Sequence, residues 1–306
     1  MKPLSFTLRV AVLALLLGIF FIVGAQLAGI EKVSASGNSS GAAPQQPRAP
    51  QGFLAPFASF CLATSLVMSW LAVHSRLSGR KLIAILAIAM YGVMTVATQV
   101  ESLFFLRDKM PVSLIWRLFV QGAITTALFV PALVALMGRL RRPRGMITVS
   151  SASLPSSALL KRLAISVVLF IFLYMFFGYF VAWRNPVLRQ FYGGVDAPNF
   201  LVALKNSWQT RPGIYVLQVF RGVLYFACVL PLVRMLPAPK WEAALTISAF
   251  LSVWSLALLL PNPIMPRTVA LSHFWETLMC FLVFGAVLGW MLSDRTRPAS
   301  LVKTAS

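Results

Sequence analysis

The sequence predicts an all-α, polytopic transmembrane helical bundle of about eight spans, with both termini in the cytoplasm. Hydrophobic residues make up 59% of the 306 positions and charged residues only 11%. The mean hydropathy is +0.82, far above that of a soluble domain. The basic residues collect in the segments between long apolar runs. We therefore expect residues 1–306 to form a single transmembrane domain.

The apolar runs set the number of spans. A run of about 18 or more apolar residues is long enough to cross the hydrocarbon core of a bilayer as a helix. Eight runs meet this length, and they are Val10–Ile30, Gly52–Val73, Leu82–Leu106, Pro111–Met137, Leu163–Trp183, Gly213–Val233, Ala243–Leu260 and Thr268–Leu292.

The first run has two interpretations. Lys2 and Arg9 precede it, and the triplet 33–35 (Val-Ser-Ala) resembles a signal-peptide cleavage site. The run of 21 residues is longer than the ~7–15 residues of a signal-peptide core, which favours a retained helix. Cleavage would leave seven spans in the same orientation.

The distribution of Lys and Arg predicts the orientation. Of the 27 Lys and Arg residues, sixteen fall in segments on one side, nine on the other and two within spans. The richer side faces the cytoplasm in most membrane proteins. The sequence therefore predicts a multi-pass protein of the inner (plasma) membrane.

Three connecting segments differ in composition. Residues 34–51 are rich in Ser, Gly, Pro and Gln, which predicts a flexible exterior linker. Residues 138–160 predict a basic cytoplasmic loop close to anionic lipid. Residues 184–212 predict an exterior loop with a short interfacial helix, which begins near Asp196 and Pro198. Its apolar residues recur at helical spacing, and they are Phe200, Leu201, Leu204 and Trp208.

Five ionisable side chains interrupt the apolar runs, and they are Glu101, Arg117, Arg221, His273 and Glu276. A charge at the centre of a membrane helix costs about 2.5–3.5 kcal/mol, so it is seldom there without a partner or a function. Each lies six to nine residues from a charged or turn residue at the exterior end of its run. That separation corresponds to a depth of roughly 9–14 Å. We therefore expect these groups to converge in one layer near the exterior surface.

Neighbouring polar residues extend this layer along helical faces, because residues three or four apart share a face. Gln121 follows Arg117 by four positions, and Gln218 and Tyr225 flank Arg221. The candidate substrate-binding residues are Arg117, Arg221, Arg189, Arg211, Gln121, Gln218 and Tyr225, and the candidate catalytic residues are His273, Glu276 and Glu101.

Three functions fit this pattern. The leading interpretation is non-enzymatic, a carrier or a lipid- or anion-binding protein in which Arg221 and Arg117 contact an anionic group. The second is a transferase or hydrolase that acts on a lipid-linked substrate at the outer leaflet, with His273 or Glu101 as general base. The third is a structural membrane subunit, in which Glu101 pairs with Arg117 and Arg221 with Glu276.

Other classes are disfavoured. The formal charge of +20 follows from membrane topology, and no nucleic-acid-binding motif accompanies it. No cofactor and no metal are expected, because the layer contains one histidine and His74 lies at the other membrane surface. The three cysteines resemble small apolar residues. No motif identifies a family or a partner subunit, so the expected partners are membrane lipids and an anionic small molecule or lipid head group.

Overall fold

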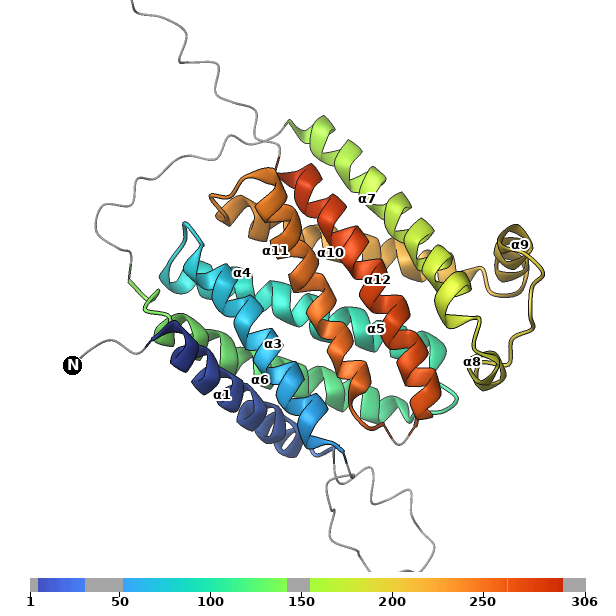
Figure 1. Cartoon of the computed structure of the whole chain (residues 1–306), viewed down its shortest axis with the longest axis horizontal. Helices are drawn as coiled ribbons and strands as arrows, with labels where there is room; N and C mark the ends of the chain where they lie inside the picture. Colours follow the sequence, from blue (N-terminus) through green and yellow to red (C-terminus); the bar gives the residue numbers. More distant parts are fainter. Residues whose placement is uncertain (1–4, 31–51, 142–154, 263, 294–306) are drawn as a thin grey trace, which may run out of the picture.

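The computed structural model describes residues 5–30, 52–141, 155–262 and 264–293. Within these ranges all of the regular secondary structure is helical, and the long helices pack side by side as a bundle (Figure 1). Eight helical segments are long and apolar enough to cross a membrane. This confirms the predicted fold class and indicates a multi-pass membrane protein.

Five spans are single α-helices, and they are α1 (Phe6–Leu27), α3 (Leu54–Val73), α6 (Val112–Leu136), α10 (Gly213–Met235) and α12 (Arg267–Leu292). The other three change helix type along their length. One consists of α4 (Gly79–Met90), η1 (Tyr91–Val96) and α5 (Ala97–Phe105), the second of α7 (Ser156–Phe177) and η2 (Gly178–Ala182), and the third of α11 (Lys240–Ser252) and η3 (Val253–Leu259). Two further helices, α8 (Pro186–Phe191) and α9 (Phe200–Thr210), are too short to span.

The spans alternate in direction, so the connecting segments collect at two ends of the bundle. We call the end that carries α8 and α9 the distal end; it lies opposite the start of α1 and the end of α12 (Figure 1). The charge distribution predicts that the distal end faces the exterior, and this orientation stays a prediction. The expected linker 34–51 lies outside the described residues, as do residues 142–154 of the expected basic loop.

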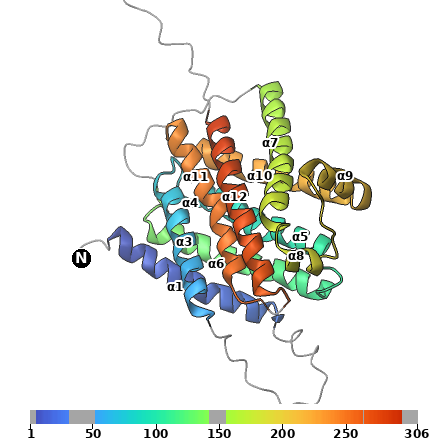
Figure 2. The same cartoon turned by 45° about the vertical axis from the view of Figure 1, so that its right-hand side comes forward.

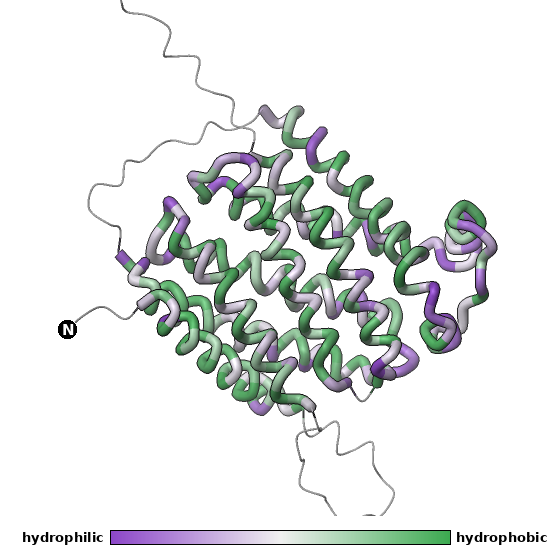
Figure 3. Tube along the Cα trace, viewed as in Figure 1, coloured by the Kyte–Doolittle hydropathy of each residue, from purple (hydrophilic) through white to green (hydrophobic). Residues whose placement is uncertain are grey.

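The exposed aromatic residues match a membrane setting. Trp70, Trp241 and Trp290 are exposed near the end opposite α9, and Trp116 and Trp208 are exposed near the distal end. Tryptophan is enriched at both membrane–water interfaces, where its ring bridges apolar and polar surroundings. Figure 3 shows hydrophobic residues along the helices and hydrophilic residues mainly at the helix ends.

Small residues allow a close approach of the backbones of α11 and α12. A Cβ atom added to Gly285 would lie 2.6 Å from the Ser248 Cα atom, and one added to Gly289 would lie 2.6 Å from the Ala243 carbonyl oxygen. These glycines are four positions apart and share one face of α12. Because lipid gives apolar helices little drive to associate, such close backbone packing is a main source of their affinity.

The π-helical segments lie beside two of the candidate site residues. η1 ends five residues before Glu101, and η2 places Gly178 against Glu276, where a Cβ atom would lie 3.3 Å from the Glu276 Oε1 atom. A π-helical turn adds a residue and rotates the side chains that follow, and such turns are frequent at functional sites.

We predict that Gly285→Ala destabilises the bundle by about 1–3 kcal/mol, the usual cost of overpacking a close contact. The added methyl group would meet backbone atoms of α11, which have no rotamer to change. Gly18→Ala is the control, because its Cβ atom would lie 3.4 Å from the Phe57 ring, an ordinary contact. Thermal unfolding in detergent measures both, and equal midpoints for the two variants would contradict the prediction.

Candidate functional site

A buried arginine on α10 forms the centre of the site. Arg221 is 4% exposed, and its Nη1 atom donates to the Glu101 Oε1 atom of α5 at 2.9 Å. Nη1 also donates to the Gln218 Oε1 atom at 3.1 Å, and Nη2 donates to the Tyr225 hydroxyl at 3.0 Å. Gln218 and Tyr225 lie one helical turn on either side of Arg221, so the sequence spacing itself delivers these contacts.

Aromatic rings enclose the same guanidinium group. The Arg221 Cζ atom lies 5.5 Å from the centroid of Phe170 and 5.7 Å from those of Tyr174 and Tyr225. Two nearby donors, the Arg221 Nε and Gln218 Nε2 atoms, are buried without a hydrogen-bond partner among the described residues. The guanidinium therefore has a carboxylate on one side, aromatic faces around it and donor capacity still unused.

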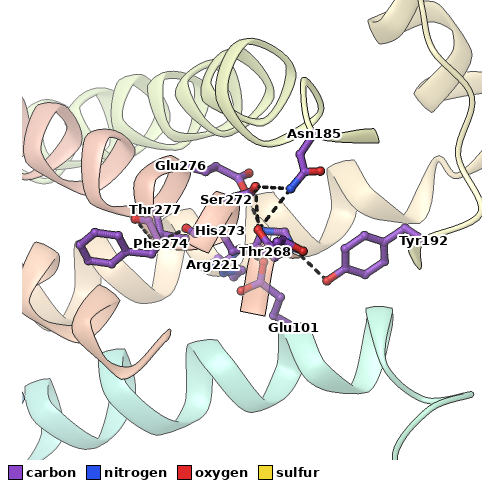
Figure 4. Close-up of polar contacts among 10 residues, drawn as sticks. All are labelled: Glu101, Asn185, Tyr192, Arg221, Thr268, Ser272, His273, Phe274, Glu276 and Thr277. Atoms are coloured by element: carbon purple, nitrogen blue, oxygen red, sulfur yellow. Dashed lines mark hydrogen bonds and ion pairs between the residues drawn. The ribbon is translucent and has the colours of Figure 1, made fainter. Parts of the chain in front are cut away.

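A second group of contacts links α12 to the distal loop. The His273 Nδ1 atom lies 2.7 Å from the Glu276 Oε2 atom, and its Nε2 atom lies 3.0 Å from the Tyr192 hydroxyl (Figure 4). Because a carboxylate only accepts, Nδ1 carries the proton in the neutral imidazole, and Nε2 accepts from Tyr192. The result is a hydrogen-bonded chain from a buried carboxylate through an imidazole to a phenol.

Tyr192 was missing from the sequence prediction. It directly follows α8, its ring lies 6.0 Å from the Phe105 ring, and its carbonyl oxygen accepts a hydrogen bond from Arg211 at 3.0 Å. Burial, together with the nearby carboxylates Glu101 and Glu276, raises the pKa of the Tyr192 hydroxyl above its ordinary value. The hydroxyl therefore keeps its proton at neutral pH and can donate a hydrogen bond. The only signal in the sequence was the aromatic pair before two glycines in the predicted exterior loop.

Further contacts hold this loop over the site. The Asn185 side chain caps α8 and donates to the Ser272 hydroxyl of α12 at 2.9 Å. The Arg189 Nη1 atom donates to the Trp183 carbonyl oxygen at 2.7 Å, and Nη2 lies 3.4 Å from Asp196. Arg189 and Arg211 thus fix the loop. The helix expected near Asp196 begins at Phe200, because the Asn199 side chain is its N-cap.

The cluster is accessible at two of its members. Glu101 retains 28% of its side-chain exposure and His273 retains 22%, whereas Arg221 and Glu276 are buried. Figure 4 shows Glu101, Arg221, His273 and Glu276 directed toward one another from α5, α10 and α12. Glu101 and His273 thus reach the surface of the bundle, whereas their partners lie inside it.

Arg117 and Gln121 belong to a different contact. Arg117 donates from Nη1 to the carbonyl oxygens of Ala28 and Gly29 at 2.8 and 3.0 Å, and Gln121 donates to that of Phe21 at 3.2 Å. Their polar stripe on α6 thus hydrogen-bonds to the last turns of α1. Arg117 satisfies carbonyl groups that an α-helix leaves unpaired at its C-terminus.

The structure pairs the charges differently from the expectation. Arg221 pairs with Glu101, although Glu101 was expected to pair with Arg117. Glu276, which was expected to pair with Arg221, instead contacts His273. Hydropathy gives the depth of each residue, but it does not give the order of the helices around the bundle. Within the described part of the chain, no group of three or more His, Cys, Asp or Glu residues is suited to hold a metal ion.

A comparison with known proteins finds no matching family model, no matching curated protein and no matching solved structure.

We predict that Glu101→Leu destabilises the protein by roughly 2–4 kcal/mol, because it leaves the Arg221 charge buried without its partner. Removal of one partner from a fully buried ion pair usually costs about 3–5 kcal/mol. The expected loss is somewhat smaller here because the Glu101 side chain is 28% exposed. The double variant Glu101→Leu with Arg221→Met should recover most of the loss. Unfolding midpoints in detergent measure this cycle, and a double variant as unstable as the sum of the single variants would refute the coupling.

Proposed function

We propose that this protein is a membrane carrier for an anionic group, with Arg221 as the anion contact and Glu101 as its exchangeable counter-ion. The observation that supports this proposal is the contact of the Arg221 Nη1 atom with a carboxylate at 2.9 Å. A carboxylate or phosphate ligand would form the same charge-assisted hydrogen bonds. Glu101 therefore has the position and the chemistry of a stand-in for the ligand.

The exposure of the two partners fits such an exchange. Arg221 is buried and held by Gln218 and Tyr225 on its own helix, whereas Glu101 is 28% exposed. When a ligand anion binds Arg221, Glu101 must leave the pair. Its carboxylate then avoids a second negative charge at the site by taking up a proton. Anion binding and proton uptake are thereby linked.

Several other titratable groups lie near the Glu101–Arg221 pair and influence its charge state. Those that act electrostatically on the Glu101–Arg221 pair or its close neighbours are Tyr174, Tyr192, Tyr225, His273, Glu276 and Cys280. The chain from Tyr192 through His273 to Glu276 reaches the distal loop and lies within electrostatic range of Glu101. In this proposal Glu101, whose side chain is 28% exposed, takes up its proton directly at the distal end.

We expect anion binding to strengthen as the pH falls. One linked proton gives up to about a tenfold change in affinity per pH unit, so affinity at pH 5.5 should exceed that at pH 7.5 by up to roughly 100-fold. Inorganic phosphate and succinate are the probes, and the shift of the thermal unfolding midpoint of the purified protein is the readout.

Two variants test the assignment. Glu101→Gln should bind the active anion well at both pH values, because Arg221 has lost its charged competitor. Arg221→Gln should lose the anion-dependent shift, while Arg234→Gln, an exposed cation at the other end of α10, should retain it. Unchanged pH dependence in Glu101→Gln would refute the exchange, and no shift with any probe in the wild-type protein would refute anion binding.

A second candidate function is an acid–base enzyme that acts on a lipid-linked substrate. The observation that favours it is the pairing of the His273 Nδ1 atom with Glu276 at 2.7 Å, with Nε2 directed toward Tyr192. A carboxylate that orients an imidazole is the usual arrangement of a histidine general base. In the present arrangement Tyr192 occupies the acceptor nitrogen, so a substrate hydroxyl or water would replace it.

We predict from this candidate that the wild-type protein changes the composition of a membrane lipid extract and that His273→Gln does not. Mass spectrometry of the extract before and after incubation with purified protein is the measurement. His74→Gln is the matched control, because His74 lies at the opposite end of the bundle and bonds only locally, to the Trp70 carbonyl oxygen. An extract that wild-type protein leaves unchanged would contradict the enzymatic function.

A further inference from the structure

A groove lies outside the Arg221 site, between the distal end of α7 and the start of α9. Its volume is about 410 Å³, and it is lined by Tyr179, Phe180, Arg184, Pro198, Asn199, Phe200 and Leu201. Two hydrogen bonds fix the segment that closes it. The Tyr179 hydroxyl donates to the Ala197 carbonyl oxygen at 3.1 Å, and the Trp183 indole donates to that of Val195 at 3.1 Å. The shape of the groove is therefore held by specific hydrogen bonds.

The polar part of the groove is an arginine without a counter-ion. The Arg184 Cζ atom lies 4.9 Å from the centroid of the Tyr179 ring and 5.9 Å from that of Phe180. Its side chain is exposed, and no ion pair joins it to a carboxylate within the described ranges. An exposed guanidinium held on aromatic faces at the end of a span is suited to bind a phosphate group.

The apolar part continues from the groove along α7. Phe172, Phe176 and Phe180 are four positions apart, with ring centroids 5.8 and 4.7 Å apart, and Phe200 of α9 lies 5.7 Å from Phe180. This ladder of phenylalanine rings leads into a second groove of about 470 Å³, lined by Ala164, Ile165, Val168, Leu169 and Phe172. An aromatic and aliphatic track thus joins the arginine to the middle of the span.

The position of α9 fits the surface of a membrane. Figures 1 and 2 show α9 beside the distal end of α7, outside the bundle of long helices. None of its residues is buried, and Leu201 and Trp208 are 74% and 62% exposed. An amphipathic helix with exposed leucine and tryptophan is typical of the bilayer interface. Arg184 would then lie at the level of the lipid phosphates.

We propose that this track binds one anionic phospholipid of the leaflet at the distal end, with its phosphate on Arg184 and an acyl chain along the phenylalanine ladder. The charge of Arg184 matches a phosphate group, and the exposed Val168 and Phe172 match an acyl chain. Phe180 and Val168 are separated by about 18 Å along the helix at 1.5 Å per residue. That distance is close to the ~15 Å depth of one leaflet.

The lipid site is separate from the anion site. It uses none of the side chains around Arg221, although η2 contributes to both, with Tyr179 in the groove and Gly178 against Glu276. The Arg221→Gln variant should therefore retain lipid binding, so a failure of the proposed carrier function and a failure of this proposal can be distinguished.

The test is native mass spectrometry of the full chain in detergent, titrated with phosphatidylglycerol and, separately, with phosphatidylcholine. The wild-type protein should bind one phosphatidylglycerol more tightly than any further one and more tightly than phosphatidylcholine. Arg184→Gln should weaken that first event by about fivefold, the effect of one basic residue at an anionic lipid surface. Lys205→Gln is the matched control, because Lys205 is an exposed cation of α9 that does not line the groove.

Further arms separate the alternatives. Phe180→Ala shortens the ladder and should weaken phosphatidylglycerol binding while leaving the unfolding midpoint near that of the wild type, since Phe180 is 43% exposed. Inorganic phosphate alone should not compete at the same concentrations. Equal loss in the Arg184 and Lys205 variants would show nonspecific charge attraction, and competition by free phosphate would show a soluble ligand; either result overturns the proposal.

Discussion

The cost of an unpaired charge in hydrocarbon governs the arrangement at the distal end of this bundle. The Arg221 guanidinium is 4% exposed and surrounded by aromatic rings, where it must have a counter-charge and hydrogen-bond acceptors. Glu101 supplies the charge from another span, and Gln218 and Tyr225 supply acceptors from the same helix. The pairing requires α5 and α10 to meet in one register, so the site and the helix packing are determined together.

Departures from regular α-helix make this register possible. The η1 turn precedes α5, and a Cβ atom on Gly122 of α6 would overlap Thr95 of η1, so the two segments approach closely. At the other side of the site, η2 brings Gly178 beside Glu276. π-helical turns are frequent at functional sites, and here one precedes the helix that carries Glu101 while the other contacts Glu276.

Similar polar chemistry has two uses in the same molecule. The stripe on α6 that contains Arg117 and Gln121 donates to carbonyl oxygens of α1, and it joins two helices. The cluster around Arg221 instead combines carboxylates, an imidazole and a phenol, and two of its members remain partly exposed. Hydrogen bonds from Arg117 and Gln121 to backbone carbonyl groups favour helix assembly. The side-chain partners of Arg221 can be exchanged for a ligand, and part of the cluster is exposed. This difference is the basis for the carrier proposal.

The sequence by itself determined the all-α class and the eight spans, because hydropathy and the fixed rise of a helix depend only on local composition. It also placed Gln218 and Tyr225 beside Arg221, since residues three and four apart share a helical face. Only the tertiary structure decided that Arg221 meets Glu101, that Arg117 serves α1 and that Tyr192 reaches His273. These contacts join residues more than 80 positions apart, and their choice depends on how all the helices fill the bundle together, which no local pattern encodes.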